Sequence, residues 1–215
     1  IGDHVCALLS GGGYAEEVVV PAGQVLPIPS GLNLTEAAAI PEVFATAYLN
    51  LYMEAALAPG ERVVLHAGAS GVGTAAIQML KASGNPSFVT VGSAEKIEQC
   101  VQLGADGGFN RHDGDLGESL KAWSADGVDV ILDPVGGQYL SANLSALRRN
   151  GRLVLIGLMG GAVTGRKIYG TFPDLAPGAS HDAGRGRQVP STSCDEFFAE
   201  MAQWMGVSHS DLDHV

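Results

Sequence analysis

The segment at residues 62–78, RVVLHAGASGVGTAAIQ, constrains the fold of this chain more than any other. Residues 63–65 indicate a buried strand, and a glycine-rich turn separates them from a helix that begins near Val72. The turn contains Gly68, Gly71 and Gly73. Because a helix N-terminus presents unpaired N–H groups and the positive end of its dipole, this turn suits a phosphate. The pattern also fits an ordinary βα turn whose glycines only pack a helix onto a sheet.

From residue 61 to residue 156, strand-like runs alternate with helical segments, which is typical of a parallel α/β sheet. Strands are predicted at 63–66, 88–91, 108–110, 128–132 and 153–156, and helices at 72–83, 94–103, 116–124 and 139–147. Right-handed crossovers between five such strands give a Rossmann-type parallel sheet with helices on both faces.

The flanking segments have a different character. Residues 1–34 are expected to form strands and turns, since prolines and glycines interrupt their short apolar runs. A short helix is predicted at 35–39 and a longer one at 41–56. After residue 165 the sequence is rich in Gly, Pro, Arg and Asp and has no period, apart from a candidate helix at 194–205.

The 215 residues carry a net charge of −11. This acidic balance argues against a nucleic-acid or anionic-membrane surface, because both need a basic patch. No apolar run approaches the roughly 18 residues that a membrane helix requires. The widely spaced Cys6, Cys100 and Cys194 give no disulfide framework and no zinc knuckle. We therefore expect no metal and a reduced, cytoplasmic compartment.

The residues after the second predicted strand favour NADP over NAD. A NAD site has an acidic residue about 20 residues beyond the glycines, where it binds the ribose hydroxyls. Here that position is small and neutral, and Lys96 follows one turn later. Glu95 favours NAD instead, so both cofactors stay open. Arg111, just past the third strand, is a second candidate for the phosphate, although it also fits a solvated loop residue.

Two further glycine runs follow the fourth and fifth strands, at Asp133–Gly137 and Gly157–Gly161. Because ligands collect at the carboxyl ends of strands in an open α/β sheet, both runs would border the nicotinamide half of a pocket. They also fit plain turns. No acid/base pair and no serine-nucleophile elbow stand out. His66 fits a structural role better than a catalytic one, so the catalytic residues stay unassigned.

Several segments together resemble one family. They are GDHVCALL, GGGYAEEVVVPAGQVLPIPSGLNLTEAAAIPEVFATAY, HAGASGVGTAAIQ, LGADGGFN, ILDPVGG and GRLVLIGLMGG. Their order and spacing are similar to those of the zinc-free quinone oxidoreductases of the medium-chain dehydrogenase/reductase superfamily. The resemblance is strongest to the NADPH:quinone reductases that a tumour suppressor induces in animals, and it covers residues 1 to about 163.

The resemblance implies hydride transfer from NADPH to a quinone, in a cleft between a β-rich, GroES-like catalytic domain and the Rossmann domain. This chemistry needs mainly positioning and a dry pocket. Members of the family are usually dimers or tetramers, which implies a homodimer here. The implied cofactor contacts are Thr46, Ala69, Ser70, Gly71, Val72, Gly73, Gly92, Ser93, Lys96, Asp133, Val135, Gly136, Gly157, Leu158 and Met159. Arg111 stands where the family often has a tyrosine.

The chain departs from the family at both ends. The family's chains start roughly ninety residues earlier, a length within the range of ordinary domains, so we expect a truncated chain. We divide it into a catalytic-domain remnant (1–40), a Rossmann NADP-binding domain (41–165) and an atypical, poorly ordered tail (166–215). Codons for residues 180–204 can be chosen so that a one-base shift spells a family-like continuation. The tail is therefore hypothesised to be a shifted frame or a splice product.

Three functions stay open. The first is an NADPH:quinone oxidoreductase whose activity is impaired in this incomplete chain. The second is a nucleotide-binding or regulatory fragment with no turnover, which interacts with full-length subunits. The third is another member of the superfamily, such as an enoyl reductase. A zinc alcohol dehydrogenase has little support in the sequence.

Overall fold

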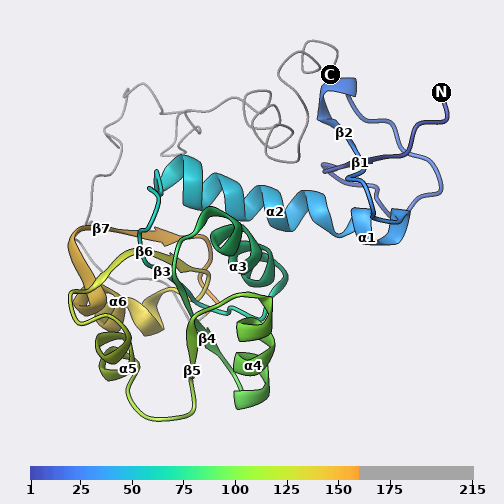
Figure 1. The fold of residues 1–215 in the computed structure, drawn as a ribbon. Coiled ribbons are helices and arrows are strands. Elements are labelled where there is room, and N and C mark those ends of the chain that lie inside the picture. The colour runs from blue at the N-terminus through green and yellow to red at the C-terminus, as the bar shows by residue number, and fades with distance from the viewer. Residues whose placement is uncertain (160–215) are drawn as a thin grey trace, which may run out of the picture. The chain divides into compact units, whose positions relative to one another are not determined.

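The computed structural model describes residues 1–159 (Figure 1). The contacts between residues divide this part of the chain into two units, of which one is Ile1–Ala45 and the other begins at Thr46. The predicted helix at 194–205 and the predicted tail lie outside the described residues. The domain boundaries after residues 40 and 165 stay predictions.

The first unit contains a small antiparallel sheet. Strands β1 (Val5–Ala7) and β2 (Val25–Pro27) pair with Cys6 opposite Leu26, and both of these side chains are buried. The short 3₁₀ helix η1 (Ala22–Gln24) precedes β2, and α1 (Leu34–Ala38) follows it. Residues 14–20 form no strand, and the Val19 side chain is fully exposed.

Helix α2 (Ile40–Tyr48) continues as a π-helical segment, η2 (Leu49–Glu54). The predicted helix at 41–56 is therefore present, with a change of winding in its second half. Tyr48 and Tyr52 stack across this change, with ring centroids 5.3 Å apart.

The second unit is built on a five-stranded parallel sheet in the order β5-β4-β3-β6-β7. The strands are β3 (Val63–Leu65), β4 (Ser87–Val91), β5 (Gly107–Asn110), β6 (Val128–Asp133) and β7 (Leu147–Leu155). The helices are α3 (Gly71–Ser83), α4 (Ala94–Leu103), α5 (Leu116–Trp123) and α6 (Leu140–Ala146), with the 3₁₀ helix η3 (Gly137–Tyr139) before α6. This order confirms the predicted Rossmann-type α/β fold.

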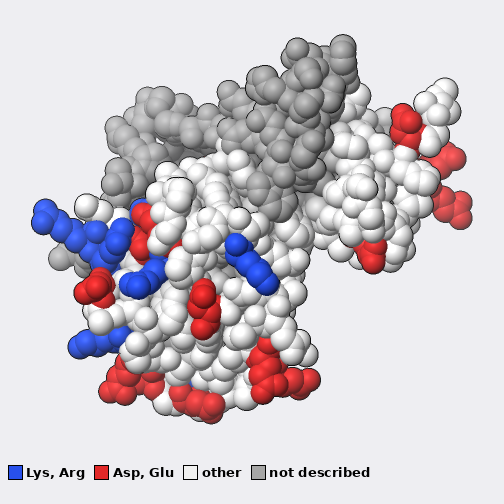
Figure 2. Space-filling view, in the orientation of Figure 1, with Lys and Arg blue, Asp and Glu red and all other residues white. Residues whose placement is uncertain are grey.

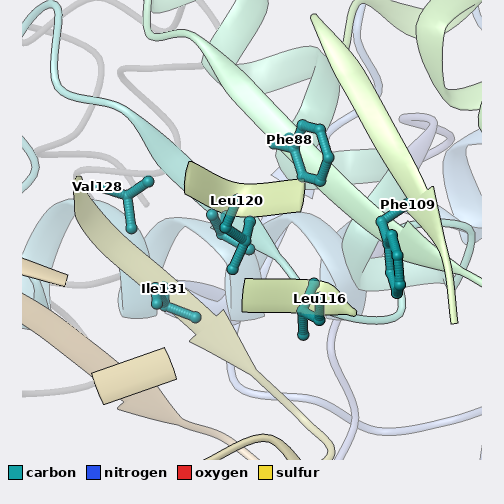
Figure 3. Close-up of a cluster of buried hydrophobic side chains, with 7 residues drawn as sticks. Phe88, Phe109, Leu116, Leu120, Val128 and Ile131 are labelled. Atoms are coloured by element: carbon teal, nitrogen blue, oxygen red, sulfur yellow. The ribbon is translucent and has the colours of Figure 1, made fainter. Parts of the chain in front are cut away.

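Helices cover both faces of the sheet. In Figure 1, α3 and α4 lie together on one side, while α5 and α6 lie together on the other. Every residue of β3, β4 and β6 is buried, as expected for parallel strands covered on both faces. Under α5, apolar side chains from four strands and the helix form one cluster (Figure 3): Val64, Phe88, Phe109, Leu116, Leu120, Val128 and Ile131.

The fifth strand differs from its prediction. It was predicted at 153–156, yet β7 begins at Leu147, and the predicted helix at 139–147 is shortened to 140–146. The pairing with β6 shifts between Val128 and Val130, so β7 carries a bulge that includes Asn150 at φ 65°. Because Arg148–Gly151 is polar and turn-like, periodicity alone hides this part of the strand.

Within residues 1–159, no helix combines the length and apolar character needed to cross a bilayer. On the face shown in Figure 2, blue Lys and Arg side chains and red Asp and Glu side chains are interspersed, with much of the surface between them uncharged.

Candidate functional site

The turn between β3 and α3 is fixed by close backbone packing. A Cβ atom on Gly68 would lie 2.5 Å from Val89 Cβ, and one on Gly73 would lie 2.4 Å from the carbonyl oxygen of Gly68. Ser70 caps α3, since its hydroxyl accepts a hydrogen bond of 3.1 Å from the Gly73 N–H. Gly68 and Gly73 are therefore required for packing, and exposed Gly71 is left at the open end of the helix.

The next turn places two cations near this opening. Ser93 caps α4 by accepting from the Lys96 N–H at 3.3 Å, which sets Lys96 in the first turn of that helix. Arg111 follows β5, and its guanidinium lies over Gly92, where an added Cβ would be 3.4 Å from Arg111 Cζ. Strands β4 and β5 are neighbours, so these cations reach the same edge of the sheet.

The loop after β6 is held by a buried carboxylate. Asp133 is fully buried, and its Oδ1 accepts hydrogen bonds from the N–H groups of Val135 at 2.6 Å and Gly136 at 2.9 Å. Gly157 approaches this loop so closely that an added Cβ would lie 2.7 Å from the Pro134 carbonyl oxygen. Gly157 thus shapes the loop through close backbone packing, and Gly136 through its hydrogen bond to Asp133.

A buried polar chain lies behind the loop. His66 Nδ1 is 2.9 Å from Thr90 Oγ1, and His66 Nε2 is 2.6 Å from Asn143 Oδ1. Asn143 Nδ2 donates to Asp133 Oδ2 at 2.9 Å. All four side chains are at most 2% exposed. Burial lowers the pKa of His66, although its hydrogen bond to Asn143 and the nearby Asp133 charge act in the opposite direction.

The turns enclose a pocket of about 460 Å³ at the carboxyl ends of the strands. Its lining is Ala67, Ala69, Ser70, Thr90, Val91, Gly92, Lys96, Arg111, Val135, Gln138, Tyr139 and Met159. This is the edge of an open α/β sheet at which ligands bind. Seven of the predicted residues therefore come together: Ala69, Ser70, Gly92, Lys96, Arg111, Val135 and Met159.

The other predicted residues do not line this pocket. They are Thr46, Gly71, Val72, Gly73, Ser93, Asp133, Gly136, Gly157 and Leu158. Two of them fix segments that carry lining residues, since Ser93 caps the helix that carries Lys96 and Asp133 holds the loop that carries Val135. Thr46 lies in α2, and its carbonyl oxygen accepts from the Asn50 amide.

Five lining residues were not predicted: Ala67, Thr90, Val91, Gln138 and Tyr139. Thr90 could have been predicted as a site residue, because it is the one polar residue of the predicted strand at 88–91 and lies near its end. Tyr139 is the second residue after the Gly136-Gly137 pair and was predicted to begin a helix instead. The ring of Tyr139 lies 4.5 Å from that of His66, centroid to centroid, so one face of it is covered by the buried chain.

The chemistry available in the pocket is that of anion binding. Two cations line it and no carboxylate does, among the residues that the structure describes. The same residues contain no cluster of His, Cys, Asp or Glu that could hold a metal ion. Phosphate groups suit a helix N-terminus that faces such cations.

Comparison with known proteins gives consistent matches. A family model described as zinc-binding dehydrogenase matches residues 71–176. The lovastatin diketide synthase lovF of Aspergillus terreus is 40% identical over 161 residues, which are 73% of this chain and 6% of that protein. The human synaptic vesicle membrane protein VAT-1 homolog is 35% identical over 166 residues, or 77% of this chain and 42% of that protein. This chain thus spans less than half the length of these relatives.

Solved structures resemble the chain in the same region. The quinone oxidoreductase of Thermus thermophilus, whose structures include a complex with NADPH, is 37% identical with a TM-score of 0.68. The match covers 76% of this chain and 52% of that one. The CurK enoyl reductase is also 37% identical, with a TM-score of 0.60, and the match covers 66% of this chain and 42% of that one.

Proposed function

We propose that this chain is an oxidoreductase of the medium-chain dehydrogenase/reductase superfamily, and that its pocket binds NADPH and serves hydride transfer to a quinone. The observation that carries this proposal is the convergence of Ser70, the N-cap of α3, with Lys96 and Arg111 on one pocket at the carboxyl edge of the sheet. The Thermus thermophilus enzyme, described as a quinone oxidoreductase in complex with NADPH, supports the same assignment.

The residues at the α3 turn fit a diphosphate. The N–H groups of Gly71 and Val72 enter no hydrogen bond within residues 1–159, because a first helical turn has no carbonyl partners for them. Gly71 is exposed at the first position of α3 and carries no side chain that would cover these N–H groups. These residues would hold the diphosphate.

The residues beside β4 and β5 fit a phosphorylated ribose. Lys96 and Arg111 both line the pocket, whereas Glu95 is exposed on α4 and is absent from the lining. A 2′-phosphate would be paired with two cations, and an unphosphorylated ribose would find no carboxylate there. We therefore propose NADPH rather than NADH.

When bound, the nicotinamide supplies the hydride. The part of the chain described here contributes binding and orientation, since the Asp133-held loop and Met159 border the pocket on the β6 and β7 side. A quinone as substrate, the zinc-free branch, a homodimer and a cytoplasmic location belong to the same proposal. The free, buried thiols of Cys6 and Cys100 agree with a reducing compartment.

The test compares binding with turnover in the 215-residue chain. NADPH binding is measured by the change in its fluorescence on titration, and turnover by NADPH oxidation with small ortho- and para-quinones. Lys96→Met is expected to weaken NADPH binding about tenfold or more and to leave NADH binding unchanged, because a charge-assisted hydrogen bond is worth about 1.5–3 kcal/mol. Equal affinity for NADH and NADPH would contradict the cofactor assignment.

Two other functions remain as alternatives, and the same assay separates them. Similarity to the lovF synthase and the CurK enoyl reductase favours reduction of an enoyl thioester, so oxidation of NADPH by an enoyl thioester and not by quinones would support that activity. Binding without oxidation of either substrate would support a non-catalytic nucleotide-binding fragment.

A further inference from the structure

The loop that follows β5 is fixed by its own hydrogen bonds. The Arg111 N–H donates to the Val91 carbonyl oxygen at 2.9 Å, which ties the loop to the end of β4. The side chain of Asn110 accepts from the His112 N–H at 3.3 Å and donates to Asp113 Oδ2 at 2.9 Å. These contacts set the backbone positions of Arg111 and His112 before any ligand binds.

The guanidinium of Arg111 is confined on one of its flat faces. A Cβ added to Gly92 would lie 3.4 Å from Arg111 Cζ, 3.4 Å from Nη2 and 3.7 Å from Nε. A point in the plane of the group would lie at clearly different distances from these three atoms, so the near-equal values mean that the flat face is turned toward Gly92. The bare backbone of Gly92 provides the space in which the guanidinium lies.

His112 holds the same group at its inner nitrogen, since Arg111 Nε donates to His112 Nε2 at 3.3 Å. Because an arginine side chain only donates, His112 Nε2 must accept, and the hydrogen of the neutral imidazole is on Nδ1. The terminal nitrogens of Arg111, Nη1 and Nη2, enter no hydrogen bond or ion pair within residues 1–159. They are left for a ligand in the pocket that Arg111 lines, whereas His112 is absent from that lining.

We infer that His112 is a positioning residue for the recognition of a 2′-phosphate: it holds the Arg111 guanidinium over Gly92 and leaves the terminal nitrogens for the phosphate. Holding the group in advance removes part of the conformational entropy that an exposed arginine otherwise loses on binding. The phosphate as partner of Arg111 rests on the proposed function, whereas the hydrogen bond between Arg111 and His112 does not.

The first experiment measures binding by calorimetric titration with 2′,5′-ADP and 5′-AMP, which differ only in the 2′-phosphate. His112→Phe keeps a ring and removes the acceptor, so the affinity for 2′,5′-ADP is expected to fall about threefold and that for 5′-AMP to stay unchanged. His112→Gln offers an amide oxygen as acceptor and should restore the affinity for 2′,5′-ADP. His4→Phe is the matched control, since His4 is an exposed imidazole that does not line this pocket.

A double-mutant cycle tests whether His112 acts through Arg111. In the Arg111→Met background the guanidinium is gone, so His112→Phe should have no further effect on the affinity for 2′,5′-ADP. Equal losses from His112→Phe in both backgrounds would overturn the positioning role, because a general change of the loop weakens binding whether or not the guanidinium is present.

The second experiment needs no ligand. The ¹⁵N chemical shifts of the His112 ring, recorded at about pH 8, where an ordinary imidazole is neutral, report which nitrogen carries the hydrogen. Hydrogen on Nδ1 is expected, and hydrogen on Nε2 would overturn the hydrogen bond from Arg111. If the wild type prefers 2′,5′-ADP and His112→Phe keeps the full preference, the positioning role is wrong while the proposed function stands. If the wild type binds 2′,5′-ADP no more tightly than 5′-AMP, the proposed NADPH site fails, and with it the phosphate as partner of Arg111.

Discussion

At the scale of single residues, the glycines of the β3–α3 turn have separable tasks. Gly73→Ala would place a Cβ 2.4 Å from the Gly68 carbonyl oxygen, which belongs to the backbone and cannot move aside. We expect the free energy of unfolding, measured by urea denaturation, to fall by about 1–3 kcal/mol. Gly11→Ala is the control, since a Cβ there meets no atom within 4 Å. Equal stability of the two variants would show that the turn tolerates the added atom.

For Gly71 we expect the opposite result, namely an effect on NADPH binding and not on stability. It is exposed at the first position of α3, so a larger side chain there costs less than about 1 kcal/mol in helix propensity. Gly71→Val would instead cover the N–H groups that the diphosphate needs. We expect unchanged unfolding and a loss of NADPH binding in a fluorescence titration, and undiminished affinity would contradict the placement of the diphosphate.

The burial of His66 is expected to make the stability of the fold depend on pH. Its pKa in the folded chain lies below the ordinary 6.5 because burial disfavours the charged ring. The unfolded chain therefore takes up a proton first, so the stabilising contribution is complete above about pH 6.5 and is lost as the pH falls toward the folded pKa. Between about pH 7 and pH 5.5, we expect the urea midpoint to fall more in the wild type than in His66→Gln. His112→Gln offers the control, since it removes an exposed imidazole that lies outside the buried polar chain.

At the scale of elements, Arg152 ties β7 to the loop that precedes β3. Its guanidinium donates to both Glu61 carboxylate oxygens, at 2.9 Å and 2.5 Å, and to the Ala55 carbonyl at 2.8 Å. The Arg152 hydrogen bond is the main reason that the pKa of Glu61 is lowered. Arg152→Met is expected to cost about 1–2 kcal/mol, allowing for partial exposure of the pair.

The stability lost in Arg152→Met could come from the broken Arg152–Glu61 ion pair or from lost packing, and only the ion-pair contribution depends on pH. Because the pKa of Glu61 lies below 4.5 in the folded chain, the contribution is complete above about pH 4.5 and is lost at lower pH. The stability difference between the wild type and Arg152→Met should therefore shrink as the pH falls through the folded pKa. Arg149→Met, at an exposed position of the same strand, should change stability little at any pH.

Local patterns predicted most of the elements because each of them depends on neighbouring residues. The predicted bounds of α4 match the structure, since Ser93 and Gly104 mark its two ends in the sequence. The start of β7 was missed, because a bulge follows from pairing with β6 and not from local composition. The valines at 18–20 lie in the segment expected to form strands and turns, and they form no strand because they pair with no other strand within residues 1–159.

The candidate site, like the fold, could be predicted from the sequence only in part. The glycine turns and Lys96 could be predicted from the βα pattern, because helix N-termini and strand ends can be recognised in the sequence. The polar chain was not, since it joins Thr90, His66, Asn143 and Asp133 from four separate elements or loops. Only the strand order 4-3-6 brings the ends that carry these residues side by side.

At the scale of the whole molecule, the pocket exists only in the folded sheet, because its lining comes from the ends of β3, β4, β5, β6 and β7. NADPH that binds there must therefore stabilise the fold by mass action. At a free concentration about a hundred times Kd, we expect the free energy of unfolding to rise by about 2.7 kcal/mol.

Urea denaturation with and without NADPH measures this rise, and NADH at the same concentration is the matched ligand. Since Lys96 and Arg111 are exposed cations in a chain of net charge −11, added salt should reduce the NADPH effect by screening them. Lys96→Met should bring the effect of NADPH down toward that of NADH. A rise that is equal for both cofactors and insensitive to salt would mean that neither cation contacts the ligand, and that the 2′-phosphate points away from the edge formed by β4 and β5.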